Sequence, residues 1–589
     1  MNGNTLDGLF LERKKFVLIG LTGRTGSGCT TAATILETKK NKQIFPSSTE
    51  VSVASGGIYE GLDLRRYEIL SSYAKENWSE FVSIKISDLI SAYLILLSKK
   101  DVLEFIWKSS HKSKVTKSSI EKSLDRIIEN NKRMSGYKDL LNQLLGFTGG
   151  LDPKSLKEEE FLRFLVLVRK FTRDLKRELC NLDEGLYVSA YQRAGNSIRK
   201  TGRVSVGYED EDFNKEAIFT LPETINRIVK CLREIKDTCY IVIDAIRNPY
   251  EARFFKDRYS AFYLLSVNTS GSARSKYLHE VHKFDPDQRA VLDQTESGKL
   301  VKDGEVVSPG NWGERITITD VKKCLQVSDI HVYNPRSELS NTNVIRAQLF
   351  WYFSLMLHPG LVSPTAMERV MQIAFTAKAN SGCISRQVGA VVTGDDFSIR
   401  AVGWNDVPAG QVPCGLRTVQ GALSSFDSVV YSNYERNDDG FRSVLKRNNE
   451  KLIANINVLG GRPLSYCFKD NQNDYKKDRN QVHTRSLHAE ENAFLQISKY
   501  GGSPVKGGKL FTTASPCELC SKKAVQIGVE EVVFIDPYPG ISSEHVLSNG
   551  LHQPKLVQFR GGVGSGYHRL YEPLMPFKDE LSYLDSLTL

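Results

Sequence analysis

Short apolar runs alternate with polar segments of helical spacing along the chain, and this pattern predicts a mixed α/β protein. The apolar run 16–20 leads into a glycine-rich loop and then an alanine-rich stretch, which predicts strand, loop and helix. Apolar runs at 240–244 and 262–267 predict further buried strands, followed by a basic helix at 270–282. We therefore expect a parallel sheet in the first part of the chain.

The segment 80–186 departs from this strand pattern. Leu and Ile recur in it at helical spacing, and lysines concentrate in 98–132 and 154–177. The segment is therefore predicted to be a helical insertion. A solvated helix face is the usual explanation of such charge, and a nucleic-acid contact is the alternative.

Helices and strands also alternate in the last part of the chain. We expect helices at 366–379, 488–495 and 518–527 and strands at 386–392, 508–515 and 531–535. The segment 334–348 is polar and rich in turn-forming residues, as domain boundaries often are. The sequence thus predicts two domains, 1–345 and 346–589.

Composition narrows the class of protein. The 589 residues are 40% hydrophobic and 25% charged, enough for two or three substantial cores. The net charge of +10 favours polyanionic or phosphorylated ligands without choosing between them. The ten cysteines are scattered, so no disulfide framework is expected. No apolar run could span a membrane and the N-terminus lacks a signal-peptide pattern, which predicts a cytoplasmic protein with no membrane partner.

Two short motifs near the C-terminus carry the clearest chemistry. His488 and Glu490 form an H-x-E motif, and Cys517 and Cys520 form P-C-x-x-C. One imidazole and two thiolates suit tetrahedral Zn²⁺ and leave a fourth position for water, whose pKa the ion lowers. Glu490 is not a ligand and is expected to transfer protons. Together the motifs are typical of zinc nucleobase deaminases, whereas either motif alone fits a structural zinc site or a packed cysteine pair equally well.

Four segments in chain order resemble the deoxycytidylate deaminase branch of the cytidine deaminase-like superfamily. They are R-Q-V-G-A-V-V at 386–392, G-W-N-D-V-P-A-G at 403–410, H-A-E-E-N-A at 488–493 and S-P-C-E-L-C at 515–520. The resemblance covers about 345–589 and implies a three-layer α/β/α domain. It also implies that Asn405 contacts the substrate sugar, that Ser385 and Arg386 contact phosphate, and that Tyr538 flanks the substrate. An exposed strand-edge charge at Arg386 and a packing role for Tyr538 are the alternatives.

A long insertion, 411–486, separates Asn405 from His488. It contains Cys414, Cys467 and His483, which could form a second, structural zinc site, with or without Cys383. A substrate lid or an oligomer contact is the alternative.

The glycine-rich loop near the N-terminus has the spacing of a P-loop, with cysteine in place of the usual lysine. Its residues are Gly23, Arg24, Thr25, Gly26, Ser27, Gly28, Cys29, Thr30 and Thr31. The loop amides could hold phosphate and Thr30 could reach Mg²⁺, but the lysine charge is missing. We therefore expect nucleotide binding, with or without Mg²⁺, and not phosphoryl transfer. Arg24 or a basic residue from elsewhere could replace the lysine.

The strand 240–244 ends in Asp244 and resembles the Walker B strand of nucleotide kinases. The resemblance implies that Asp244 orders Mg²⁺ through water and that Arg247 meets a phosphate. The alternative is a buried strand with a polar end.

A P-loop kinase-like domain followed by a deoxycytidylate deaminase-like domain resembles the bacterial anti-phage dCTP deaminases. The resemblance implies deamination of dCTP, and also of dCMP, to uracil nucleotides, which depletes the pool during infection. It further implies a regulatory N-terminal domain, a homo-oligomer and an activating or inhibitory partner. An RNA- or DNA-editing deaminase and a nucleotide-binding switch with a vestigial deaminase are the alternatives.

Overall fold

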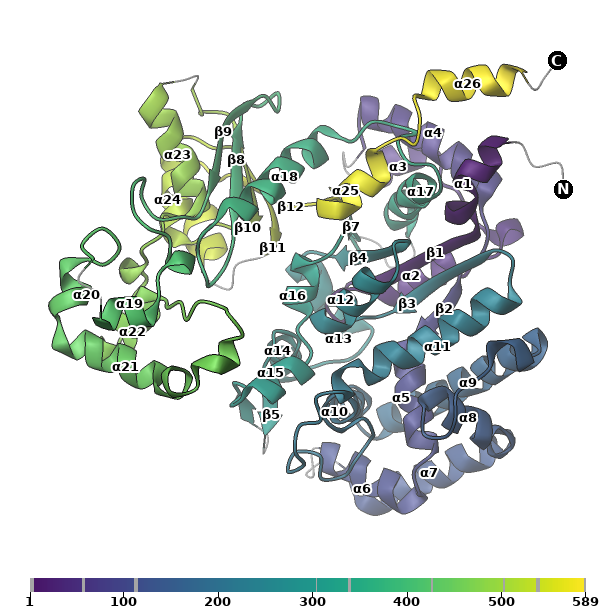
Figure 1. Cartoon of the computed structure of the whole chain (residues 1–589). Coiled ribbons are helices and arrows are strands. Elements are labelled where there is room, and N and C mark those ends of the chain that lie inside the picture. Colours follow the sequence, from purple (N-terminus) through teal and green to yellow (C-terminus); the bar gives the residue numbers. More distant parts are fainter. Residues whose placement is uncertain are drawn as a thin grey trace. The chain divides into compact units, whose positions relative to one another are not determined.

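The computed structural model describes residues 5–55, 59–110, 115–302, 305–336, 341–424, 427–501, 504–536 and 541–586. The chain divides into two compact units (Figure 1). Unit 1 comprises 1–363 and 565–589, and unit 2 comprises 364–564. Both contain strands and helices, so the predicted mixed α/β class is confirmed. Among the described residues, no helix is long and apolar enough to cross a membrane.

The sheet of unit 1 is parallel, and the glycine-rich loop follows its strand β1 (Phe16–Thr22). Within this unit the strands run in the order β7 (Ile330–Tyr333), β4 (Phe262–Asn268), β1 (Phe16–Thr22), β3 (Cys239–Asp244) and β2 (Val82–Lys85). Leu18 packs into one hydrophobic core and its neighbours Val17 and Ile19 into another, because successive side chains point to opposite faces. The sheet is therefore covered on both faces, as parallel sheets generally are.

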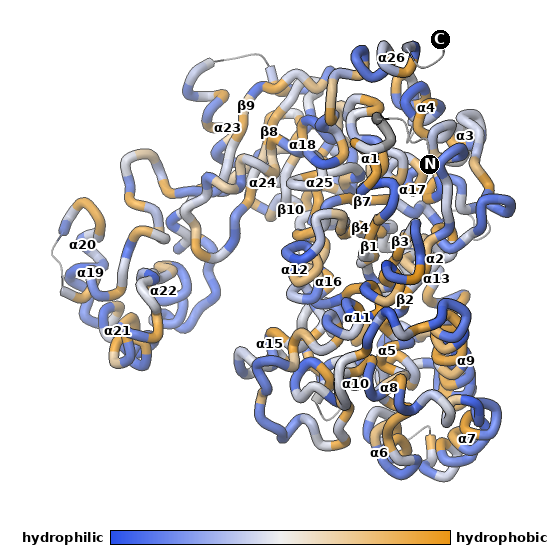
Figure 2. The backbone as a smooth tube through the Cα atoms, turned by 45° about the vertical axis from the view of Figure 1, so that its right-hand side comes forward, coloured by the Kyte–Doolittle hydropathy of each residue, from blue (hydrophilic) through white to orange (hydrophobic). Residues whose placement is uncertain are grey.

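Helices occupy most of the chain between β2 and β3. They are α5 (Ile86–Ile95), α6 (Lys99–Ser109), α7 (Lys117–Asn130), α8 (Lys138–Leu145), α9 (Glu158–Leu182), α10 (Leu186–Thr201) and α11 (Thr220–Ile235). Hydrophilic and hydrophobic residues are mixed along the whole of α9 (Figure 2), and its buried residues include Phe161, Phe164 and Leu175. The lysine-rich pattern thus includes an amphipathic helix with one face in the core. The sequence prediction missed β2, which has only four residues.

The remaining elements of unit 1 surround the sheet. They are α1 (Thr5–Lys15), α2 (Cys29–Leu36), α3 (Ser48–Ser55), α4 (Leu62–Asn77), α12 (Pro249–Arg258), α13 (Gly271–Glu280), α14 (Pro286–Glu296), β5 (Leu300–Lys302), β6 (Glu305–Val307), α15 (Trp312–Thr317), α16 (Val321–Gln326), α17 (Asn343–Leu357), α25 (Gly564–Tyr571) and α26 (Phe577–Ser586).

The unit boundary differs from the expected division at 345/346 in two places. Helix α17 belongs to unit 1, where Phe350, Trp351 and Phe353 are buried, because a helix that is apolar on all sides needs a core around it. The C-terminal segment 565–589 also returns to unit 1, and Trp351 Nε1 donates a hydrogen bond of 3.3 Å to the Tyr571 hydroxyl. Unit 2 is therefore inserted within unit 1 in sequence.

Unit 2 has a mixed sheet with helices on both faces. The strand order is β12 (Lys555–Gln558), β11 (Glu531–Asp536), β10 (Lys509–Ala514), β8 (Gly389–Thr393) and β9 (Ile399–Trp404), and β8 is antiparallel to both of its neighbours. One core contains α23 (Ala489–Tyr500) and α24 (Glu518–Gln526), and the core on the other face contains α18 (Ala366–Ala377). These elements make three layers, and the short strand β13 (Gly561–Gly562) follows them.

The insertion between β9 and α23 folds around its own small core. Its helices are α19 (Val419–Ser424), α20 (Asn433–Asn437), α21 (Asp439–Ala454) and α22 (Phe468–Lys476). Val419, Phe441 and Leu445 are fully buried there. Arg417 and Glu435 form a buried ion pair that the Tyr466 hydroxyl joins, so the core contains a hydrogen-bonded charge pair.

Candidate active site and metal centre

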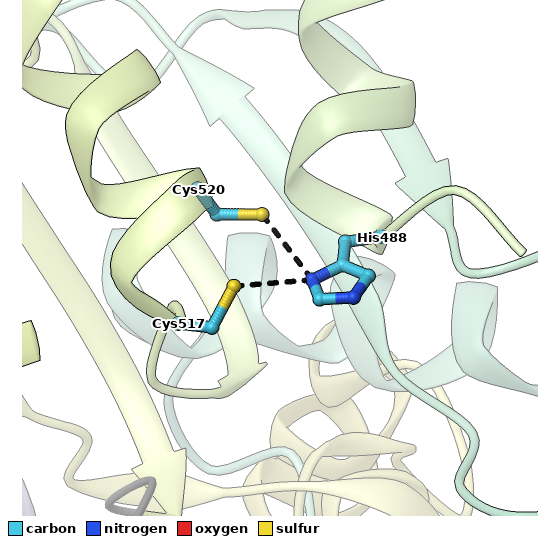
Figure 3. Close-up of side chains that lie close together, drawn as sticks. All are labelled: His488, Cys517 and Cys520. Atoms are coloured by element: carbon cyan, nitrogen blue, oxygen red, sulfur yellow. Dashed lines mark hydrogen bonds between the residues drawn. The ribbon is translucent and has the colours of Figure 1, made fainter. Parts of the chain in front are cut away.

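Three metal-ligand side chains converge at two helix starts in unit 2. His488 directly precedes α23, Cys517 directly precedes α24, and Cys520 lies in the first turn of α24 (Figure 3). His488 Nδ1 lies 3.3 Å from Cys517 Sγ and 3.5 Å from Cys520 Sγ. Tetrahedral Zn²⁺ would separate a nitrogen and a sulfur ligand by about 3.6 Å, since its bonds to them are about 2.0 and 2.3 Å long. The donors therefore have the spacing that this ion requires.

Among the described residues, this is the only group of three or more His, Cys, Asp or Glu side chains whose donor atoms lie close enough to hold a metal. A hydrogen bond from Cys520 lowers the pKa of the Cys517 thiol to about 3, and the same contact raises the pKa of Cys520. A metal ion binds cysteine as thiolate, so its binding here would displace protons from the pair. The helix dipoles also favour thiolate at these positions.

A close contact between strand and helix sets the position of α23. A Cβ atom on Gly403, in β9, would lie 2.3 Å from the Ala489 carbonyl oxygen and 2.5 Å from the Ala493 nitrogen. Only glycine permits this approach. Asn492 Nδ2 also donates to the Trp404 carbonyl at 2.9 Å. The G-W-N segment therefore seats the first turn of α23, which begins next to His488, against the sheet.

Glu490 lies in that first turn and is 4% exposed. The Thr512 hydroxyl, on β10, donates a hydrogen bond of 3.0 Å to Glu490 Oε1. Burial raises the pKa of this carboxyl group above its ordinary value, and the charge of His488 acts in the opposite direction. Such a carboxyl group can hold a proton closer to neutral pH than an exposed one, as a general acid and base requires.

Arg386 forms an ion pair with Asp536, a fully buried residue at the end of β11. The sequence analysis missed Asp536 as a partner, although an acid at the carboxyl end of a strand was the available signal. Ser385 is exposed, and its hydroxyl lies 3.8 Å from Cys467 Sγ. Arg386 therefore contacts a protein carboxylate that the sequence analysis did not predict. The expected contact of Arg386 with a phosphate stays a prediction.

The Asn405 side chain is buried and contacts the backbone that precedes β8. Its Oδ1 accepts from the Val388 amide at 2.6 Å, and its Nδ2 donates to the Arg386 carbonyl at 2.8 Å. These bonds hold the chain at 386–388 outside the strand, so β8 begins at Gly389 and not at the expected Arg386. An amide has two N–H groups and two lone pairs, so one of each remains after these bonds.

Two further sequence expectations concern Tyr538 and a second zinc site in the insertion. Tyr538 lies outside the described residues. The second zinc site proposed from Cys414, Cys467 and His483 does not form, since these side chains make no donor group within the described ranges. Arg485 lies 3.8 Å from Cys414 Sγ, and His483 lies 3.7 Å from Asp478. The sequence left this site open beside a substrate lid or an oligomer contact, and the positions of the donor atoms among the described residues do not support it.

In unit 1, residues 23–28 form the glycine-rich loop between β1 and α2, and Cys29, Thr30 and Thr31 are the first residues of α2. The loop and Asp244, at the end of β3, line a cavity of about 580 Å³. Burial raises the pKa of the Cys29 thiol to about 12 and also raises that of Asp244. Cys29 is therefore neutral at physiological pH.

The glycine-rich loop is hydrogen-bonded to Glu296, a residue that the sequence analysis missed. The Thr25 amide and hydroxyl donate to the buried Glu296 carboxylate at 2.9 and 2.5 Å, and Arg247 Nη1 donates to it at 3.0 Å. Arg247, for which a phosphate contact is expected, pairs with this carboxylate. Because Glu296 lies 271 residues from Thr25, no local pattern indicated the contact.

The family match of this chain lies within unit 2. Residues 364–536 match the family described as cytidine and deoxycytidylate deaminase zinc-binding region. Deoxycytidylate deaminases of Enterobacteria phages T2 and T4 are 27% and 25% identical over 176 and 170 residues, which are 29% of this chain in each case and 79% and 77% of the relatives.

A structure of dCMP deaminase from cyanophage S-TIM5 with dCMP and dUMP is 22% identical, covering 34% of this chain and 99% of that one with a TM-score of 0.21. Because the family match lies within unit 2, this unit contains a cytidine and deoxycytidylate deaminase-like domain.

Proposed function

We propose that unit 2 is a zinc-dependent deaminase that converts the cytosine of free deoxycytidine nucleotides to uracil. The observation that carries this proposal is the His488, Cys517 and Cys520 donor group with buried Glu490 two residues from the histidine. The family match and the phage deoxycytidylate deaminases support the choice of substrate class.

His488, Cys517 and Cys520 would hold the ion, since their chemistry and spacing fit Zn²⁺. When bound there, zinc supplies a Lewis acid that lowers the pKa of water toward neutrality. Glu490 would take a proton from the attacking water and deliver it to the ring nitrogen. It would then take the second proton of that water, from the hydroxyl now on the ring carbon, and give it to the amino group as the carbon–nitrogen bond breaks, so that water and cytosine give uracil and ammonia. The Thr512 hydroxyl orients the carboxylate for both transfers.

For the sugar and the phosphate of the substrate, we propose contacts with side-chain donors and acceptors that the hydrogen bonds described above leave available. Asn405 would use its remaining N–H and lone pair on the sugar. Arg386 would share its guanidinium between Asp536 and a phosphate, since that group has five N–H donors, and exposed Ser385 would add a hydroxyl. Both dCMP and dCTP are proposed as substrates.

Unit 1 would bind a nucleotide and regulate unit 2. Its glycine-rich loop and the cavity beside it support the binding part of this proposal. The resemblance of the two-part chain to anti-phage dCTP deaminases supports a role in depleting dCTP during infection, in a homo-oligomer.

Offering dCMP, dCTP, CTP and a cytosine-containing oligonucleotide in parallel tests the substrate class. We expect uracil product from the deoxyribonucleotides and at least about tenfold less from the oligonucleotide, because the proposed Arg386 and Asn405 contacts grip one free nucleotide. Product quantified by chromatography is the readout. Conversion of the oligonucleotide alone would identify an editing enzyme and overturn the proposal.

A further inference from the structure

The segment that follows β7 packs directly on the glycine-rich loop of unit 1. Asn334 Nδ2 donates to the Ser27 carbonyl at 2.9 Å. Gly28 has φ of 120°, and a Cβ atom there would lie 2.4 Å from Asn334 Nδ2 and 3.6 Å from Arg336 Nη2. The Arg336 guanidinium is therefore held beside Gly28, the residue immediately before Cys29.

Arg336 stacks on an aromatic ring, and no acid among the described residues neutralises it. Its guanidinium carbon lies 3.6 Å from the centre of the Tyr277 ring, and Tyr277 belongs to α13. The Arg336 Nε atom is buried, and no hydrogen-bond partner for it is found among the residues that the structure describes. Within the same residues, no carboxylate forms an ion pair with Arg336. A stacked arginine with unused donors is well suited to binding an anion.

The cavity that Arg336 lines has an excess of positive charge. Three of its arginines are paired with acids, Arg169 with Glu37 and Asp88, Arg199 with Glu251, and Arg247 with Glu296. Arg24, Lys85 and Arg173 also line it and form no ion pair in the described parts of the chain. Such a cavity favours a ligand with several negative charges.

The cavity also has aromatic and amide side chains that suit a nucleotide base. Tyr187 and Tyr191 lie on its wall with ring centres 4.2 Å apart. The Gln192 Nε2 atom, on the same helix, is buried and has no hydrogen-bond partner among the described residues. A volume of about 580 Å³ is in the range of nucleotide-sized pockets.

We propose that this cavity binds a nucleoside polyphosphate and that Arg336 supplies the positive charge that a P-loop lysine would place there and Cys29 lacks. The inference deepens the nucleotide-binding function proposed for unit 1. The charge thus comes from the segment after β7, and the buried thiol leaves room for the phosphates near the loop amides.

The test uses the full-length protein and measures binding of ATP, GTP, dTTP and inorganic tripolyphosphate by calorimetry. Arg336→Gln is expected to weaken binding about tenfold to a hundredfold, because a charge-assisted contact is lost. Adding Cys29→Lys to Arg336→Gln is expected to restore most of the affinity. Arg65→Gln, which changes an arginine whose side chain is 80% exposed, is the matched control and should bind like the native protein.

The double variant separates a charge role from a packing role. If Arg336 only supports Tyr277, adding Cys29→Lys does not restore binding, and that result overturns the proposal. Unchanged binding by Arg336→Gln, or no binding of any of the four probes by the native protein, overturns it as well. Deamination by each variant is measured separately, so a failure of the unit 2 proposal is recognised independently.

Discussion

Replacing Glu490 with glutamine is expected to lower turnover of a deoxycytidine nucleotide by at least about a hundredfold, with zinc content unchanged. Glutamine has nearly the same volume and can still accept the hydrogen bond from Thr512, so the fold around it is preserved. It cannot take a proton from water or return one to the ring. The turnover number and the zinc content of the same preparation are the two measurements.

Glu530→Gln provides the matched control, since this glutamate is exposed and lies outside the donor group. It should have the native turnover number. A Glu490→Gln enzyme with native turnover would contradict the proton-transfer role. Parallel loss of zinc and turnover in that variant would show that Glu490 supports the metal site instead.

Replacing Cys517 with alanine is expected to remove the metal and the activity together. The donor group then keeps only His488 and Cys520, and two ligands hold Zn²⁺ far more weakly than three. Zinc content should fall from about one ion per chain to nearly none, and turnover should fall at least about a hundredfold. Atomic emission on the dialysed protein gives the first quantity.

Cys467→Ala is the control for metal content, because Cys467 lies outside the donor group. Its zinc content should equal that of the native protein. Full zinc occupancy in Cys517→Ala would reassign the ligand, and a second ion lost in Cys467→Ala would restore the rejected site in the insertion.

The parts of the site that depend on local sequence could be predicted, and those that depend on long-range packing could not. The H-x-E and P-C-x-x-C motifs each specify a helix start, so their residues could be identified before the structure was known. Arg386 and Asp536 are 150 residues apart in the sequence, and only the arrangement of the strands in the sheet brings them together. Arg336 illustrates the same limit, since nothing in its own segment indicates that it lies beside Gly28.

The unit boundary shows a related limit. The polar segment 334–348 looked like a linker, but α17 begins inside it and its apolar surface is buried in unit 1. Composition over a few residues reports local polarity, whereas membership of a core depends on the residues that follow. The short strand β2 was missed for a similar reason, because four residues are too few to establish a period of two.

The measurement that tests the central claim most directly is deamination of dCMP and dCTP by the full-length protein after zinc removal with a chelator and again after zinc return. We predict no product from the zinc-free protein, and deoxyuridine nucleotide and ammonia in equal amounts once zinc is restored. Equal turnover with and without zinc, or no turnover of either nucleotide by the reconstituted protein, would contradict the assignment of a zinc-dependent nucleotide deaminase to unit 2.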